Sequence, residues 1–100
     1  MRAEVACTGC GVELGPTPRR KAFLALLVFG DEEVRSWFFC DACQTWTIEY
    51  LEDRFLGDTT LRTAGPFPKG SCDADVALAR TCPNPGDKWC ECAAHQRLGP

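Results

Sequence analysis

The sequence lacks long apolar runs and lacks any segment typical of export. Its longest apolar stretch, residues 22–29, is far shorter than the roughly 20 residues that a transmembrane helix requires. Residues 1–6 contain no apolar core of the kind found in secretory signal peptides. We therefore expect a soluble cytoplasmic protein without membrane association.

Catalytic groups are also scarce. The 100 residues include a single histidine, His95, which lies close to several cysteines, so no Ser-His-Asp set is available. No glycine-rich loop of the P-loop or Rossmann type is present. We interpret the acidic residues 31–33 as a solvated turn. These absences predict that the protein is not an enzyme.

Positive charge is too sparse for a typical nucleic-acid-binding module. Lys and Arg number 11 against 14 Asp and Glu, for a net charge of −3. Affinity for nucleic acids comes largely from basic patches that neutralise phosphates, and the only tight basic run is 19–21. We interpret that run as the solvated start of a strand, and nucleic-acid binding is only our third hypothesis.

Cysteine, by contrast, is abundant, with eight in 100 residues. A chain of this length buries only about two-thirds of its unfolded surface, so its core is modest. Small domains supplement such a core with disulfides or metal ions. Because disulfides belong to oxidising compartments, the expected cytoplasmic location favours metal.

Two Cys-x-x-Cys pairs enclose the first apolar part of the chain. The cysteines are Cys7 and Cys10 in the first pair and Cys40 and Cys43 in the second. Together they supply the tetrahedral four-sulfur set that Zn²⁺ accepts, with Zn–S distances near ~2.3 Å. One pair alone would also suggest a redox motif, whereas two pairs predict a metal site. The alternatives are two disulfides or four free thiols. Gly9 and Gly11 suit a tight turn with positive φ.

Residues 11–39, between the pairs, predict an apolar hairpin, with strands at 22–29 and 34–39 and a turn at 30–33. After Cys43, apolar residues alternate with polar ones in Thr45-Trp46-Thr47-Ile48-Glu49-Tyr50. That alternation favours a third strand. The rival is a treble-clef helix with Ile48, Leu51 and Phe55 on one face. We prefer the strand, which gives a three-stranded antiparallel sheet.

The motifs Cys7-Thr8-Gly9-Cys10-Gly11 and Cys40-Asp41-Ala42-Cys43-Gln44 resemble those of the rubredoxin-like and zinc-ribbon group. The resemblance covers roughly residues 5–55 and implies one zinc or iron ion held at the edge of a small three-stranded sheet. Rubredoxins usually have proline after the third cysteine and glycine after the fourth, where this chain has Asp41 and Gln44. These departures favour a structural metal site over electron transfer.

The C-terminal half has a different character. We expect a linker at 58–71, marked by Gly65-Pro66-Phe67-Pro68, a short helix at 73–80 with Val76, Ala77 and Leu78 as its apolar face, and a second short helix or irregular turn at 88–98. The predicted division is therefore a zinc-ribbon or rubredoxin-like domain at 1–57, the linker at 58–71, and a Cys/His-rich metal-binding tail at 72–100. The fold class is small, metal-stabilised and β-rich (α+β).

The tail contains a second candidate metal site. Its most compact ligand set is Cys82, Cys90, Cys92 and His95. The last three donors lie within six residues, so closing the site costs little chain entropy. Cys72 is the alternative ligand, and with it in place of His95 the site would be all-cysteine. The remaining alternative is a cysteine-rich tail without metal, with a Cys72–Cys82 disulfide under oxidation.

Sites with four protein ligands are typically structural, because catalytic zinc keeps one position open. We therefore expect a non-catalytic protein with two structural Zn²⁺ ions. The strand at 22–29 is apolar on both faces and needs cover on both, which predicts a surface for a protein partner or for self-association. The alternative is rubredoxin-like electron transfer with iron at Cys7, Cys10, Cys40 and Cys43.

Overall fold

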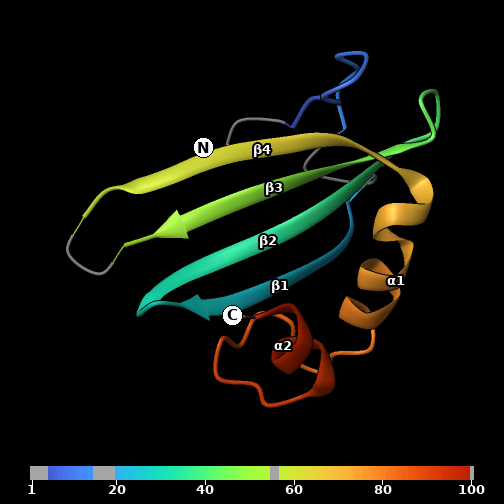
Figure 1. Cartoon of the computed structure of the whole chain (residues 1–100). Helices are drawn as coiled ribbons and strands as arrows, with labels where there is room; N and C mark the ends of the chain where they lie inside the picture. Colours follow the sequence, from blue (N-terminus) through green and yellow to red (C-terminus); the bar gives the residue numbers. More distant parts are fainter. Residues whose placement is uncertain (1–4, 15–19, 55–56, 100) are drawn as a thin grey trace.

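The computed structural model describes residues 5–14, 20–54 and 57–99, and it is organised around one open antiparallel sheet (Figure 1). The strands follow one another in space as they do in the chain: β1 (Arg20–Val28), β2 (Asp31–Cys40), β3 (Thr45–Asp53) and β4 (Thr59–Pro68). Two helices follow, α1 (Lys69–Ala79) and α2 (Ala93–Leu98). The predicted hairpin is confirmed, but its turn is shorter than the expected 30–33, because β2 already begins at Asp31. Glu33 is buried and paired with Arg35, so the acidic residues are not a solvated turn. The segment after Cys43 is a strand and not a helix.

A two-residue turn joins β1 to β2. Val28 pairs with Asp31, and the intervening Phe29 and Gly30 have φ values of 50° and 88°. Positive φ at both central residues identifies a type I′ turn, whose twist matches that of the flanking strands. Glycine tolerates this conformation, but phenylalanine rarely adopts it. Phe29 is also 93% exposed, so its side chain gains no packing in compensation.

The sheet has four strands where we expected three, and the extra strand lies in the expected linker. Residues 58–71 contain β4 and the start of α1. The Gly-Pro-Phe-Pro run that indicated a linker forms an irregularity at the sheet edge, because the register shifts between the pairs Ile48–Ala64 and Trp46–Phe67. Edge strands tolerate proline, since one side of the strand has no ladder partner, and glycine commonly marks bulges.

Each face of the hairpin carries an apolar cluster, and the two clusters differ in size. Leu24 and Trp37 belong to the larger core, which includes Val76 of α1 and Ala94 of α2. Phe38 points to the opposite face and packs in a smaller cluster with Val5, Leu14, Cys7 and Cys40. Figure 1 shows α1 alongside one end of the sheet and α2 beside β1. The two clusters place the two cysteine-rich regions on opposite faces of β2.

Helix α1 is longer than predicted, since it begins at Lys69 and not at Asp73. Its buried residues are Cys72, Val76 and Ala79, whereas Ala77 is exposed. The spacing of four and then three residues is that of one helical face. Within the described residues, neither helix has the length and apolar character needed to cross a membrane.

Candidate metal centres

Site 1 lies where the N-terminal segment meets the turn between β2 and β3. Cys40 ends β2, Cys43 lies within the turn, and the register resumes with the Cys40–Thr45 pair. The other two cysteines, Cys7 and Cys10, come from the turn after Val5. The four sulfur atoms all lie within 4.8 Å of one another.

The two Cys-x-x-Cys turns have the same backbone geometry. The N–H of Gly11 donates to the carbonyl of Cys7 at 2.9 Å, and the N–H of Gln44 donates to the carbonyl of Cys40 at 2.8 Å. Gly11 and Gln44 both have positive φ, at 81° and 56°. Gln44 therefore adopts the left-handed conformation that glycine adopts in the first turn. Its side-chain Nε2 donates to the carbonyl of Asp41 at 2.8 Å, a local bond that offsets part of the conformational cost.

The first turn is attached to β3 and to the bulge of β4. The N–H of Thr8 donates to Oγ1 of Thr47 at 3.2 Å, and the two threonine hydroxyls are 3.1 Å apart. A Cβ on Gly65 would lie 2.7 Å from Oγ1 of Thr8 and 2.8 Å from the carbonyl oxygen of Trp46. Only glycine fits at such a close approach. The bulge in β4 thus helps to hold the first turn against the second.

The sulfur–sulfur distances in site 1 fit a tetrahedral metal cage. Four sulfurs each about 2.3 Å from a central ion are about 3.8 Å apart at tetrahedral angles. Sγ of Cys7 lies 3.9 Å from Sγ of Cys43, and Sγ of Cys10 lies 3.8 Å from Sγ of Cys40. A disulfide would need sulfurs about 2.05 Å apart, and all eight cysteines are free.

Ionisation of these thiols is uneven. Burial opposes ionisation of Cys7, but hydrogen bonds from the N–H groups of Cys10 and Gly9, together with weaker ones from the Cys40 and Cys10 thiols, lower the pKa of Cys7 to about 6. A hydrogen bond with Cys10, followed by burial, raises the pKa of Cys43 to about 12. Without a cation, ionisation is therefore favoured at Cys7 and opposed at Cys43, and a dication is the group that allows all four sulfurs to be anionic.

Site 2 lies between the end of α1, the following loop and α2. Its ligand atoms come from Cys82, Cys90, Cys92 and His95, and all lie within 4.8 Å of one another. Sγ of Cys82 is 3.8 Å from Sγ of Cys90. Nδ1 of His95 is 3.4 Å from Sγ of Cys82 and 3.2 Å from Sγ of Cys92. These separations approximate the roughly 3.5 Å expected between nitrogen and sulfur ligands of a tetrahedral zinc ion.

Cys72, the alternative ligand, belongs to neither group. It is buried on α1, and its sulfur lies 3.8 Å from the hydroxyl of its neighbour Ser71. Burial is the main reason that the pKa of the Cys72 thiol is raised. The compact set with His95 is thus the one that the fold assembles, and its role as a ligand set remains a prediction.

The other nitrogen of His95 is bonded to the sheet. Nε2 lies 2.9 Å from the carbonyl oxygen of Ala25 in β1, so it carries the proton and donates. Nδ1 is then unprotonated and directs its lone pair at the sulfurs. A metal-binding histidine commonly donates its second N–H to a carbonyl in this way, which fixes both tautomer and ring orientation. The N–H of Ala25 also points toward the tail, donating to the carbonyl of Pro85 at 2.7 Å.

The thiols of site 2 show the same contrast as those of site 1. Burial opposes ionisation of Cys92, but the contacts that favour it, of which the hydrogen bond from the His95 backbone is the largest, together lower the pKa of Cys92 to about 6. Burial, followed by the hydrogen bond with Cys92, raises the pKa of Cys82 to about 12. Both groups could therefore hold a metal ion, and each provides four protein ligands.

Comparison with protein-family models, curated proteins and solved structures finds no significant match to this chain.

Proposed function

We propose that this chain is a non-catalytic zinc-binding protein with two structural sites and a surface for a protein partner or a second copy of itself. The observation that carries the metal assignment is the hydrogen bond from Nε2 of His95 to Ala25, which leaves Nδ1 free to coordinate among three sulfurs. Zn²⁺ suits both ligand sets because it accepts four sulfurs as readily as three sulfurs and a histidine nitrogen. Closed tetrahedral coordination of this kind supports folding and leaves no position for substrate.

Replacing a buried cysteine of site 1 tests this role. Cys40 is fully buried at the end of β2. Structural zinc contributes on the order of 10 kcal/mol to the folding of small domains, which is comparable to their whole stability. We expect the Cys40→Ser protein to be insoluble, or to be unfolded when it is measured by circular dichroism. Cys72→Ser makes the same chemical change outside both clusters and should fold with two bound ions. A folded Cys40→Ser protein with full metal content would contradict the assignment.

Two exposed aromatic residues support the interaction surface. Phe29 is 93% exposed and Trp89 is 68% exposed. Their neighbours Gly30 and Lys88 line one shallow groove, so both aromatics lie at the same end of the sheet. Aromatic residues are enriched in protein interfaces and dominate their binding energy. Phe29 also occupies a backbone conformation that disfavours it, and strain of this kind is characteristic of functional positions.

Self-association can be measured directly with substitutions of these aromatics. We expect the zinc-loaded protein to form dimers at high concentration in sedimentation experiments, and Phe29→Asn and Trp89→Ser to weaken the dimer. Val12→Thr is a matched control, because Val12 is 40% exposed and follows the first cysteine turn at the opposite end of β2. A monomeric wild-type protein would exclude self-association, and the proposed partner would then be a different protein. Equal weakening of the dimer by all three variants would show that Phe29 and Trp89 do not form the interaction surface.

Electron transfer through iron at site 1 is the second candidate. Cys10 is exposed and Cys43 is half-buried, so the edge of the sulfur cluster reaches solvent. The N–H of Gly9 donates to Sγ of Cys7 at 3.3 Å, and such bonds to sulfur tune the potentials of iron–sulfur centres. Purified native protein that is red and bleaches on reduction would favour this candidate. Colourless protein with stoichiometric zinc would favour the structural role.

A further inference from the structure

We propose that the groove between α1 and the sheet binds a small organic anion with a flat apolar body, such as an aryl carboxylate. The groove has a volume of about 330 Å³, which is within the size range of small-molecule sites. It lies on the sheet face that carries α1. Its lining residues are Lys21, Phe39, Trp46, Lys69, Asp73, Val76, Ala77 and Arg80.

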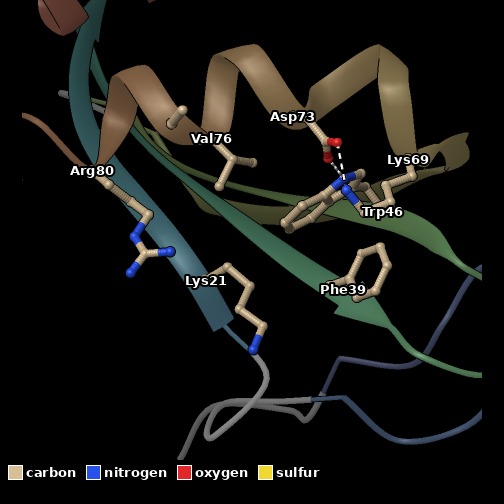
Figure 2. Close-up of a pocket in the computed structure, with 8 residues that line it drawn as sticks. Lys21, Phe39, Trp46, Lys69, Asp73, Val76 and Arg80 are labelled. Atoms are coloured by element: carbon tan, nitrogen blue, oxygen red, sulfur yellow. Dashed lines mark hydrogen bonds and ion pairs between the residues drawn. The ribbon is translucent and has the colours of Figure 1, made fainter.

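The floor of the groove is apolar and rigid. The rings of Phe39 and Trp46 are 4.9 Å apart and inclined at 59°. Nε1 of Trp46 donates to Oδ1 of Asp73 at 2.9 Å, and this bond fixes the indole against α1 (Figure 2). Val76 completes the floor from the next turn of the helix. A fixed aromatic surface of this kind favours a planar apolar ligand, because no side chain must be ordered on binding.

Positive charge at the rim specifies an anion. Lys69 is already paired, since its Nζ lies 2.7 Å from Oδ2 of Asp73. Lys21 and Arg80 form no ion pair with any residue in the described part of the chain, and both are exposed. They come from β1 and from the end of α1, and Figure 2 shows both side chains on the side of the view away from Trp46. Three cations and one carboxylate thus surround an apolar floor in a chain of net charge −3.

The size of the groove favours a small molecule over a peptide. A ligand with one or two fused rings fits a groove of this volume, and Arg80 and Lys21 line the same groove as charge partners for its carboxylate. Arginine recognises a carboxylate through two parallel N–H bonds, which adds directional specificity. The site is separate from both cysteine clusters, because none of the groove residues is a proposed metal ligand.

The probe for the test is 2-naphthoate, titrated into the zinc-loaded full-length protein. We expect saturable binding at one site, seen as movement of the Trp46 indole N–H signal in NMR spectra. Lys21→Gln and Arg80→Gln should each weaken binding by about three- to fivefold, as expected for single exposed charge contacts, and the double variant by about tenfold or more. Arg97→Gln, which changes an exposed arginine of α2 outside the groove, should have no effect.

Two further experiments distinguish the apolar contribution to binding from the ionic one. Ala77→Phe fills the groove from an exposed helix position and should abolish binding, with circular dichroism and zinc content unchanged. The neutral analogue 2-naphthalenemethanol should bind at least tenfold more weakly than 2-naphthoate. Absence of saturable binding, equal affinity for the neutral analogue, or insensitivity to the double variant would overturn the proposal. Preferential binding of an acidic pentapeptide with a central phenylalanine would reassign the groove to a peptide.

Discussion

His95 connects the second cysteine cluster to the edge of the sheet, because its Nε2 donates to the carbonyl of Ala25 at 2.9 Å. Ala25 lies in β1, whose other side pairs with β2. Its N–H and C=O both point outward, to Pro85 and His95. An unpaired edge strand is a template for unwanted pairing. The loop that carries the second cysteine cluster therefore also covers this part of the edge.

This connection predicts a non-local effect of His95→Ala. The variant should lose the second metal ion, loosen residues 82–98 and also speed hydrogen exchange at the amide of Ala25, while residues 7–14 stay protected. Local opening determines exchange rates in this way. Cys72→Ser is the control and should leave both metals and the Ala25 amide unchanged. Loss of a metal in Cys72→Ser with retention in His95→Ala would mean an all-cysteine site and would reject the assignment.

We expect the backbone conformation of Phe29 to lower the free energy of unfolding of the protein. Because its φ of 50° places a bulky side chain in the left-handed region, Phe29→Asn should raise the free energy of unfolding by about 0.5–1 kcal/mol. Gly30→Ala tests the same turn in the other direction and should lower it by about 1 kcal/mol. Urea denaturation of the zinc-loaded protein measures both. A lower stability of Phe29→Asn would show that the phenyl ring makes a stabilising contact and would contradict this view of the turn.

The two cysteine turns offer a matched pair of substitutions. Gly11→Ala should lower the free energy of unfolding by about 1 kcal/mol, since no atom crowds the added Cβ and only the φ of 81° opposes it. Gln44→Gly relieves the same conformation but loses the bond from Nε2 to Asp41, so its stability should change by less than about 1 kcal/mol. A large loss on Gln44→Gly would mean that its side chain, and not its backbone, is what the second turn requires.

Acidification should release the metals and unfold the protein. The pKa values of Cys7 and Cys92 are lowered from 9.0 to about 6, so their thiolates favour the folded state. A lowered pKa contributes stability that is complete above pH 9 and is lost as pH falls through about 6. Coordination acts in the same direction, because ligands must be deprotonated. The unfolding midpoint in urea should thus fall steadily from pH 9 to pH 6. An unchanged midpoint over this range would contradict thiolate ligation.

The sequence was sufficient for the features that depend on local pattern. The alternation from Thr45 to Tyr50 predicted β3, and cysteine spacing predicted the two groups that converge. Strand β4 was missed because Gly65, Pro66 and Pro68 are loop signals unless an edge strand with a bulge accommodates them. The hydrogen bond between His95 and Ala25 could not be predicted from the sequence either, since it joins a side chain to a backbone carbonyl 70 residues away. No residue type marks such a carbonyl as a partner.

Elemental analysis of native protein, expressed without added metal and combined with native mass spectrometry, tests the central claim most directly. Two closed tetrahedral sites predict two zinc ions per chain, with His95→Ala reduced to one. Metal-free folded protein would contradict the assignment of both clusters. One zinc ion in the unmutated chain would contradict the assignment of Cys82, Cys90, Cys92 and His95.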